Sequence, residues 1–172
     1  MGTQPTDDHG TVSAAVVTVS SERSLEEDLA GNAIADVFEA AGHEIATREL
    51  IGRSYDNVQS KVSRLVDRDD VDIVVTAGGT GVEPRDATLE AVRPLIDKEL
   101  PAFLDLFHEL SYMEIGTEVV SSRALGGVAD SVPIFCLPND VGATTLASEA
   151  IIVPEATRLA ALANGGEDDT EE

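Results

Sequence analysis

The residues whose types and spacing most clearly suggest a binding or catalytic site lie in one stretch, VVTAGGTGVEPRDATLEA, at residues 74–91. Gly78, Gly79 and Gly81 lack a Cβ, so the backbone can take positive φ values there and lie close against a ligand. Consecutive amide groups turned inward form a nest for an anion. The motif is neither GxGxxG nor a P-loop, because no Gly-Lys-Ser/Thr follows it. It therefore predicts a phosphate cradle or, as the plainer alternative, a tight turn.

Two aspartates near this kind of loop could hold a metal ion. Asp86 follows Pro84 and Arg85 and precedes Thr88, the expected N-cap of the next helix. A carboxylate beside bound phosphates is repelled by them unless it holds Mg²⁺. Asp86 is thus predicted to be a magnesium ligand or a residue that caps the helix start.

The second aspartate is Asp56, and it allows the same two interpretations. In the segment DNVQ it could serve as the N-cap of a helix, with Gln59 at the third helical position completing a capping box. Like Asp86, it is a candidate Mg²⁺ ligand.

Other kinds of catalytic site find little support. His9 lies near the start of the chain, and His43 and His108 have no partners at zinc-ligand spacing. No serine sits on a G-x-S-x-G elbow, so a serine hydrolase site is not indicated. Cys136 lies within the apolar run VPIFCLP, which predicts a buried hydrophobic residue and not a reactive thiol.

The charge balance restricts the partners of the protein. Eleven basic residues against 33 acidic ones give a formal net charge of −22 in 172 residues, and only two of the basic residues are lysines. Acidic residues spread along the chain predict a protein that works in concentrated salt; an acidic surface that docks a basic partner is the alternative. Nucleic-acid binding is disfavoured because no basic run exists. We expect a cytoplasmic protein, because there is neither a secretory signal nor an apolar run near 20 residues.

The hydrophobic pattern predicts one α/β domain over residues 12–163, with polar or acidic flexible tails at 1–11 and 164–172. Short apolar runs that alternate with helical patterns are typical of a largely parallel sheet covered on both faces. The predicted strands are 14–20, 43–51, 71–77, 115–121 and 132–138, and the predicted helices are 31–42, 57–67, 88–98, 101–112 and 142–162, the last interrupted at Pro154.

In such sheets ligands bind at the carboxyl ends of the strands. Four arginines fall in the loops next to these ends or in the segment that joins the last two strands: Arg23, Arg53, Arg85 and Arg123. In a chain of net charge −22 they would suit an anionic ligand, although loops commonly contain arginines without any such role.

Several blocks together resemble a known family. TAGGTGVEPRDATLEAVRPLIDKELPAF (76–103) and LSYMEIGTEVVSSRALGGV (110–128) are similar to signatures of the MoaB/MogA family of molybdenum cofactor biosynthesis, which includes the gephyrin G domain. VVTVSSER, AGNAIADVFEAAGHEI and IFCLPNDVGA are similar to its other blocks, in the same order. The resemblance covers roughly residues 12–162.

The resemblance implies a three-layer αβα fold with a mostly parallel sheet, assembled as a homotrimer or a dimer of trimers. It implies a molybdopterin adenylyltransferase that uses Mg²⁺ and ATP, attaches AMP to the terminal phosphate of molybdopterin and releases pyrophosphate. The adenylylated pterin would then be the substrate of a downstream molybdenum-insertion protein. The alternatives are a non-catalytic module that binds molybdopterin or a partner protein, and a nucleotide-hydrolysing enzyme of similar fold.

The resemblance also implies roles for individual residues. Asp86 matches the catalytic, Mg²⁺-binding aspartate of the family, and Asp56 matches a second functional aspartate once about two extra residues are allowed for. The phosphates of the nucleotide and the pterin would lie on the glycine loop, and the remaining segments would line the rest of the site. The implied binding residues are Thr76, Gly78, Gly79, Thr80, Gly81, Arg85, Ser122, Arg123, Pro138, Asn139 and Asp140.

The chain departs from the family in ways that bear on this function. The last strand of the family commonly ends Leu-Pro-Gly-Ser-Pro, whereas this chain has Leu-Pro-Asn-Asp-Val at 137–141. Asp140 thus places a carboxylate where the family has a hydroxyl, and this carboxylate would repel a phosphate unless Mg²⁺ or an arginine lies between them. Ser20-Ser21 replaces a Ser-Asp pair, so one polar contact is missing. Because both substrates are polyanions, activity is expected to rise steeply with salt.

Overall fold

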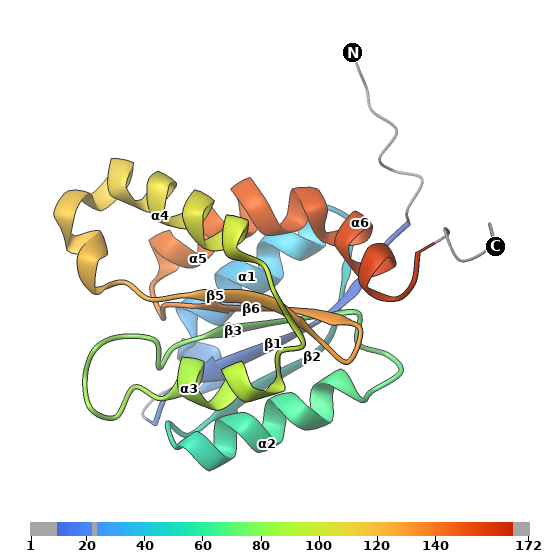
Figure 1. The fold of residues 1–172 in the computed structure, drawn as a ribbon, viewed down its shortest axis with the longest axis horizontal. Helices are drawn as coiled ribbons and strands as arrows, with labels where there is room; N and C mark the ends of the chain where they lie inside the picture. Colours follow the sequence, from blue (N-terminus) through green and yellow to red (C-terminus); the bar gives the residue numbers. More distant parts are fainter. Residues whose placement is uncertain (1–9, 22–23, 167–172) are drawn as a thin grey trace.

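The computed structural model describes residues 10–21 and 24–166, so most of the two predicted tails, and Arg23, lie outside the described residues. The described part forms a six-stranded sheet in the order β2-β1-β3-β6-β5-β4 with helices on both faces (Figure 1). The strands are β1 (Ser13–Val19), β2 (Glu44–Ile51), β3 (Ile73–Ala77), β4 (Lys98–Glu99), β5 (Leu125–Ala129) and β6 (Val132–Leu137).

The helices fall between these strands in the order that the sequence predicts for an α/β protein. The α-helices are α1 (Leu29–Ala40), α2 (Tyr55–Val66), α3 (Thr88–Val92), α4 (Pro101–Ile115), α5 (Val141–Ala147) and α6 (Val153–Ala163). Three short 3₁₀ segments, η2 (Leu25–Glu27), η3 (Arg93–Leu95) and η4 (Gly116–Ser121), and one π-helical turn, η5 (Ser148–Ile152), complete the elements. No helix in the described part of the chain is both long and apolar enough to cross a membrane.

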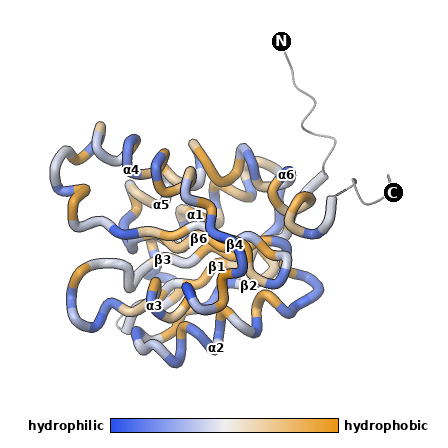
Figure 2. The backbone as a smooth tube through the Cα atoms, in the orientation of Figure 1, coloured by the Kyte–Doolittle hydropathy of each residue, from blue (hydrophilic) through white to orange (hydrophobic). Residues whose placement is uncertain are grey.

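The sheet is mostly parallel, as predicted. β2, β1, β3 and β6 run parallel, whereas β5 pairs antiparallel with β6, and β4 antiparallel with β5. Every residue of β3 and β6 is buried, which explains why these strands lack the alternation of a half-exposed sheet. Hydrophobic residues accordingly concentrate along the strands in Figure 2, and hydrophilic ones lie on the outer turns and loops.

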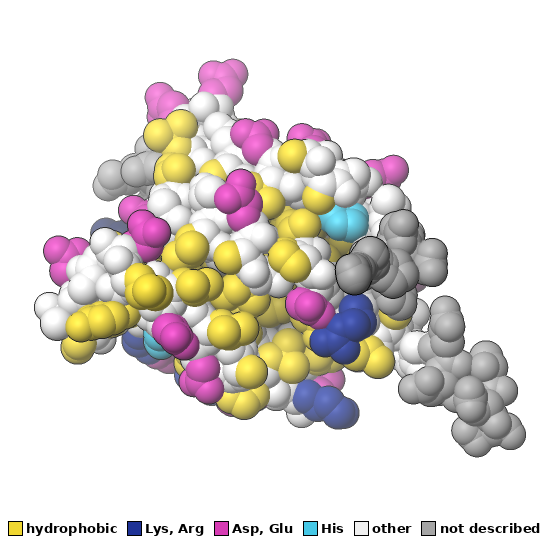
Figure 3. All heavy atoms as spheres, turned by 90° about the horizontal axis from the view of Figure 1, so that it is seen from above, with side chains coloured by type: hydrophobic (Ala, Val, Ile, Leu, Met, Phe, Trp, Pro, Cys, Tyr) yellow, Lys and Arg dark blue, Asp and Glu magenta, His cyan; other side chains and the backbone are white. Residues whose placement is uncertain are grey.

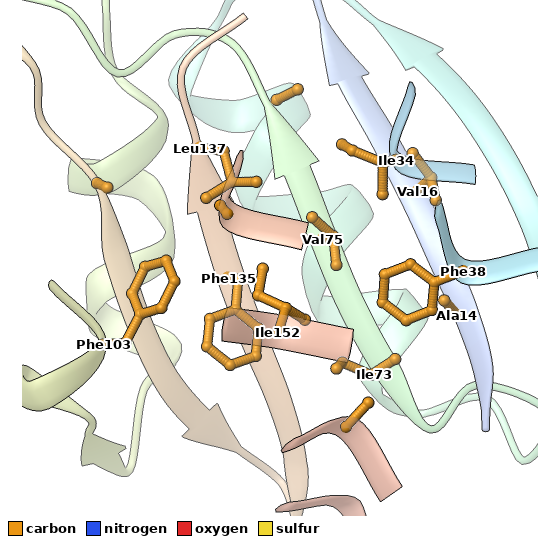
Figure 4. Close-up of a cluster of buried hydrophobic side chains, with 14 of the residues drawn as sticks. Ala14, Val16, Ile34, Phe38, Ile73, Val75, Phe103, Phe135, Leu137 and Ile152 are labelled. Carbon is orange, nitrogen blue, oxygen red and sulfur yellow. The ribbon is translucent and has the colours of Figure 1, made fainter. Parts of the chain in front are cut away.

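Successive side chains along the strands point to opposite faces of the sheet and pack into two separate hydrophobic cores, each covered by helices. The fold is therefore a three-layer αβα structure. Val16 and Val75 point to the face covered by α1 and α4–α6, where they meet Phe38, Phe135 and Ile152 (Figure 4). The alternate residues point to the face covered by α2 and α3. Burial of a side chain such as Phe38, which is fully inaccessible, contributes about 1.5–3 kcal/mol.

Cys136 belongs to the second core, as the sequence predicted. It is fully buried, and burial raises the pKa of its thiol to about 11. The group is therefore a neutral thiol at pH 7 and acts as a small hydrophobic side chain.

The predicted strand at residues 115–121 is wrong, because α4 continues to Ile115 and η4 follows it. Gly116 has a φ of 68° and ends the helix. Val120, whose apolar side chain suggested a strand, is 86% exposed. A short apolar run does not distinguish a strand from a helical segment by periodicity alone.

Strand β5, which pairs with β6, lies in the segment that the sequence analysis takes to join the last two strands. A Cβ on Gly126 would lie 2.9 Å from Cδ2 of Phe103, and one on Gly127 would lie 2.8 Å from Cδ1 of Ile96. The glycines therefore mark a close approach of other elements to the strand and not a loop.

Several helix boundaries also differ from the prediction. The helix expected over residues 88–98 ends at Val92 and continues only as η3, because Pro94 lacks the amide proton that a longer helix needs. Helix α2 begins after Ser54, whose hydroxyl accepts a hydrogen bond from the Asn57 amide, so Asp56 is not the N-cap. The predicted last helix is three consecutive segments, with Pro154 in the first turn of α6.

A buried polar cluster that the sequence analysis missed fixes the entry to α1. Asp28 is fully buried and caps the helix by accepting a hydrogen bond from the Gly31 amide at 2.9 Å. Its carboxylate also accepts hydrogen bonds from the Thr18 hydroxyl in β1 and from Arg48 Nη2 in β2, the latter at 2.8 Å. A buried carboxylate needs such partners, and here they tie α1 to two strands.

Candidate active site

A cleft of about 720 Å³ opens where β1, β3 and β6 end. Its volume is in the range of small-molecule binding sites, and the carboxyl ends of parallel strands are where ligands bind in open α/β sheets. Two walls enclose it. The strand-end wall consists of Val19, Ser20, Arg53, Gly79–Gly81, Glu83, Asp86 and Arg123; the helical wall consists of Ser111, Glu114, Ile115, Glu118, Ser121, Ser122, Pro138–Asp140, Gly142, Ala143 and Leu146.

The glycine loop at the end of β3 is fixed in place by close packing. Gly78 and Gly79 have φ values of 113° and 72°, which only glycine adopts readily. A Cβ on Gly78 would collide with the Val19 carbonyl oxygen, and one on Gly79 would collide with Oγ1 of Thr88. The Thr88 hydroxyl donates a hydrogen bond of 2.8 Å to the Gly78 carbonyl oxygen. Thr88 thus holds the loop, and the helix N-cap is Ala87 instead.

Arg123 clamps the same loop from the other side. Its Nε donates hydrogen bonds to the carbonyl oxygens of Thr80 and Gly81 at 3.0 and 3.1 Å. Its terminal nitrogens pair with the Glu90 carboxylate at 2.8 and 3.3 Å. This bonding raises the pKa of Arg123 and lowers that of Glu90 below its ordinary value of 4.5. The guanidinium is therefore committed to holding the cradle together.

Asp86 lies at the far end of the loop with both carboxylate oxygens engaged. Oδ2 accepts a hydrogen bond of 3.0 Å from the Glu83 amide, and Oδ1 lies 3.1 Å from Arg53 Nη2. The side chain of Asp86 is 10% exposed, so this ion pair is largely shielded from water. Asp86 does not cap α3; it closes the turn of the glycine loop and faces the cleft.

The loop after β6 brings a carboxylate and an amide to the cleft. Asp140 caps α5, because its Oδ2 accepts a hydrogen bond of 2.8 Å from the Ala143 amide. Next to it, Oδ1 of Asn139 is buried and has no hydrogen-bond partner among the described residues. A buried acceptor of this kind is available to a ligand that carries a donor.

The end of α4 and the following segment supply the carboxylates that sequence reasoning missed. Glu114 and Glu118 face the cleft, and so does Ser122, whose carbonyl oxygen lies 3.0 Å from Nε2 of His108. The spacing of four residues between the two glutamates is a helical signal, but the sequence analysis ends the helix at residue 112 and predicts a strand over 115–121, which contains Glu118.

The cleft has a negative formal charge. Two arginines, Arg53 and Arg123, and five carboxylates line it, so the lining has a formal charge of −3; the carboxylates are those of Glu83, Asp86, Glu114, Glu118 and Asp140. A polyanionic ligand can bind here only with cations that offset this charge, or where salt screens it.

Nine of the thirteen residues predicted for the site line the cleft: Gly79, Thr80, Gly81, Asp86, Ser122, Arg123, Pro138, Asn139 and Asp140. Four do not. Thr76 is buried in β3, Gly78 lies behind the loop surface, and Arg85 and Asp56 are exposed outside the lining. Arg53, which the sequence identifies only as one of four loop arginines, also lines the cleft.

The described residues suit a magnesium ion that arrives with phosphates. Within the described part of the chain, no group of three or more His, Cys, Asp or Glu side chains is placed to hold a metal ion. Mg²⁺ commonly binds through one or two carboxylates together with substrate phosphates and water, so it needs no such cage. Asp86 is the predicted magnesium ligand that lies beside the glycine loop and would hold the ion.

Known proteins share both the sequence and the fold. The chain is 39% identical to molybdenum cofactor biosynthesis protein B of Halalkalibacterium halodurans over 146 residues, which cover 84% of this chain and 86% of that protein. It is 37% identical over 141 residues to the protein of the same name from Escherichia coli K12, covering 82% and 83% of the two chains.

Solved structures give the same relationship. A crystal structure of molybdenum cofactor biosynthesis protein B superposes with a TM-score of 0.87 at 35% identity, covering 90% of this chain and 97% of that one. The tungsten cofactor synthesizing protein MoaB from Pyrococcus furiosus superposes with a TM-score of 0.79 at 31% identity, covering 90% and 98%. Residues 15–158 match the family described as "Probable molybdopterin binding domain". The chain belongs to this molybdopterin-binding family and has the fold of its MoaB and MogA members.

Proposed function

We propose that this protein acts in molybdenum cofactor biosynthesis as a molybdopterin adenylyltransferase that uses Mg²⁺ and ATP. The observation that carries the proposal is the pairing of a rigid glycine loop with a shielded aspartate, Asp86, in one cleft at the strand ends. The family membership supplies the substrate class. A cleft of about 720 Å³ is large enough for a nucleotide-sized ligand.

In the proposed reaction a terminal phosphate oxygen of molybdopterin attacks the α-phosphorus of ATP. The new bond joins this oxygen to the α-phosphorus, the bond between the α-phosphorus and the bridging oxygen breaks, and pyrophosphate leaves with that electron pair. Such transfers depend mainly on positioning and on neutralising charge. Bound Mg²⁺ would supply the neutralisation of phosphate charge.

The residues of the chain would do the positioning. Gly79, Thr80 and Gly81 line the cleft where the phosphates would lie, and Arg123, which also lines it, holds the Thr80 and Gly81 carbonyl oxygens. Asp86 would hold the cation at the end of this loop. Asn139, with its unpartnered oxygen, is placed to accept a hydrogen bond from a donor on the pterin or on the adenine ring.

The experiment is to measure pyrophosphate release from Mg-ATP in about 2 M KCl, where charge is screened within a few ångströms, with and without molybdopterin. The wild type should release pyrophosphate only when molybdopterin is present. Asp86→Asn should reduce the rate by at least about 100-fold, the usual cost of losing one electrostatic element of such a site. Release without molybdopterin would indicate nucleotide hydrolysis instead.

Asp140 favours a second candidate function, that of a non-catalytic module that binds molybdopterin or a partner protein. Its carboxylate faces the cleft, where it would repel phosphates. Molybdopterin binding by calorimetry without pyrophosphate release would favour this function. Asp140→Ser would then be the first variant to test for a gain of activity.

The exposed apolar side chains of α4 and η4 support the proposed homo-oligomer, a trimer or a dimer of trimers. Met113 and Val120 are 77% and 86% exposed, and Leu106 and Tyr112 are also exposed. Figure 3 shows the face that carries α1 and α4–α6, on which hydrophobic side chains gather between Asp and Glu side chains. Contiguous apolar surface of this kind marks interaction sites, and a second copy of the chain is the proposed partner.

Light scattering in about 2 M KCl should give the mass of a trimer or its double for the wild type. The double variant Met113→Glu with Val120→Glu should give the monomer mass. Tyr55→Glu, which places one negative charge on an exposed side chain of α2, on the other face of the sheet, is the control and should leave the assembly intact. A monomeric wild type would contradict the proposal.

A further inference from the structure

Arg53 forms an ion pair across the mouth of the glycine loop. It lies two residues after β2, in the loop before α2, and its Nη2 lies 3.1 Å from Oδ1 of Asp86 and 3.6 Å from Oε1 of Glu83. The arginine side chain is 24% exposed and lines the cleft. It therefore joins two strand-end loops at the point where the proposed cation ligand sits.

The two oxygens of Asp86 are held in different ways. Oδ2 accepts a hydrogen bond from the Glu83 amide and packs so closely on Gly81 that a Cβ there would lie 2.7 Å away. This oxygen is fixed by the backbone turn. Oδ1 is held by the guanidinium of Arg53, a side chain that can move. Oδ1 is thus the oxygen that becomes available to another cation when Arg53 leaves.

The two arginines of the cleft also differ in how firmly they are held. Arg123 is bound by two backbone carbonyl oxygens and by both oxygens of Glu90, so its position is part of the fold. Arg53 pairs through Nη2 with two carboxylates that themselves line the cleft. Because both partners of Arg53 line the cleft, a bound ligand could compete for them and release the arginine without breaking any contact of the core.

We propose that Arg53 exchanges partners when ligand binds: it neutralises Asp86 in the ligand-free cleft, then releases Oδ1 to a divalent cation and pairs with the phosphates of the ligand. This inference rests on the proposed function, because it takes Asp86 to be the residue that holds the cation. It makes Arg53 a residue that governs affinity for the ligand, at a position that sequence analysis left outside the predicted site.

Electrostatics gives the exchange its direction. A guanidinium and a divalent cation repel one another at contact distance, so they do not share Oδ1. Without phosphates, a cation that takes Oδ1 leaves the arginine with its longer contact to Glu83, at 3.6 Å, as the remaining ion pair that it now makes. With phosphates present, the arginine gains a bidentate partner of higher charge. Cation and phosphate should therefore each strengthen the binding of the other, as linkage requires.

The test uses Mn²⁺ as a spectroscopic stand-in for the divalent cation and pyrophosphate as the phosphate ligand, both in about 2 M KCl. Electron paramagnetic resonance measures free Mn²⁺, and calorimetry measures the affinity for pyrophosphate. For Arg53→Gln we expect opposite shifts: tighter Mn²⁺ binding to the ligand-free protein, and pyrophosphate binding in the presence of Mn²⁺ weakened by at least about tenfold, the equivalent of one charged hydrogen bond.

Two further variants sharpen the test. Arg53→Lys keeps the charge and should retain most of the pyrophosphate affinity. Arg64→Gln makes the same change at an exposed arginine on α2 that bonds to Ser60 and lies outside the cleft, so it should alter neither affinity. Asp86→Asn should abolish the Mn²⁺ site, which places the ion.

Two results would overturn the inference. If Arg53→Gln weakens Mn²⁺ and pyrophosphate binding together and lowers the melting temperature, the arginine is a structural element of the loop. If it changes neither affinity, the ion pair has no part in binding. These readouts require no turnover, so a failure of molybdopterin-dependent pyrophosphate release would reject the adenylyltransferase and leave the opposite shifts at Arg53 to be judged separately.

Discussion

The two walls of the cleft are built in different ways. In the strand-end wall, Arg123 and the Thr88 hydroxyl hold the glycine loop through its carbonyl oxygens. The helical wall instead presents the carboxylates of Glu114 and Glu118 and the unpartnered Asn139 oxygen. A preorganised wall stabilises charge without reorganisation, whereas a wall with spare polar groups adapts to the rest of the ligand. Under the proposed function, the phosphates would bind at the strand-end wall, and the helical wall would select the rest of the ligand.

The largest expected effect comes from breaking the rigid wall at Gly79. In Gly79→Ala the new Cβ would collide with Oγ1 of Thr88, so the loop must move. Displacement of a positioning element by about 1 Å can cost about 100-fold in rate, and we expect a loss of that order in pyrophosphate release. Single-turnover kinetics would measure it.

Gly42→Ala is the matched control for the backbone strain of this change. Gly42 also has a positive φ, 92°, but it ends α1, and a Cβ there meets no atom within 4 Å. It should cost about 1 kcal/mol of stability and leave the rate of the folded protein unchanged. Equal kinetic losses in both variants would show that the loop owes nothing to its packing against Thr88.

Arg123→Gln should weaken the strand-end wall without a steric clash. It removes two hydrogen bonds to the glycine loop and the pair with Glu90, and a charged hydrogen bond is worth about 1.5–3 kcal/mol when partly shielded. We expect a loss of stability near the lower figure and a fall in pyrophosphate affinity, measured by denaturant unfolding and calorimetry in concentrated KCl.

Arg158→Gln is the control for the charge change in this experiment. Arg158 pairs with Glu155 three residues away on an exposed face of α6, and such pairs contribute about 0.5 kcal/mol or less. If both variants lose the same small amount of stability, Arg123 is one more surface arginine and the strand-end wall is less rigid than its hydrogen bonds indicate.

This contrast between walls also shows what the sequence could predict. The glycines and Asp86 were predictable because they follow a buried strand and match a family pattern, whereas Arg123 was predictable from the family pattern alone. All of them line the cleft except Gly78, which is buried at the end of β3. The parallel sheet and its two covered faces were predictable from continuous apolar runs. These features could be predicted because short, continuous stretches of the sequence encode them.

The helical wall was predicted less well, because its placement depends on contacts between distant segments. Glu114 and Glu118 face the cleft where α4 continues into η4, and the two glycines of β5 allow Phe103 and Ile96 to approach the strand from opposite faces. Arg53 and Asp86 are 33 residues apart, and no local pattern pairs them. Such contacts arise from tertiary packing, which periodicity does not record.

The salt response should distinguish the walls by their charge. Pyrophosphate affinity in the presence of Mg²⁺ should rise between about 0.1 M and about 2 M KCl, because the screening length falls from about 10 Å to under 3 Å. Asp140→Ser removes one carboxylate of the helical wall and keeps a residue that caps α5, so its affinity should be a few-fold higher at low salt and its salt response flatter.

Asp140→Ala is the comparison for the capping role. It removes the same charge but also the acceptor for the Ala143 amide, so it should cost about 1 kcal/mol of stability that Asp140→Ser retains. Circular dichroism at each salt concentration would confirm that the variants are folded. A wild-type affinity that stays flat over this range would contradict the idea that repulsion in the cleft limits binding.

The smallest effect concerns the acid sensitivity of the Arg123 clamp. Hydrogen bonding to Arg123 lowers the pKa of Glu90 in the folded protein below 4.5, so the unfolded chain binds more protons near and below that pH. The stability due to this pair is complete above pH 4.5 and is lost as the pH falls through the folded pKa. Since the Glu90 side chain is 47% exposed, we expect about 0.5 kcal/mol at most.

Glu90→Gln tests this contribution, because glutamine cannot titrate and cannot pair with the guanidinium as an ion. Unfolding in concentrated KCl should show the wild type more stable than the variant at pH 6, with the difference vanishing as the pH falls through the folded pKa. Glu155→Gln, on exposed α6, gives the value of an ordinary surface pair at pH 6. A difference for Glu90 that persists unchanged into acid would mean that the carboxylate acts through packing alone, and the clamp would then depend on the two carbonyl hydrogen bonds of Arg123 without help from its charge.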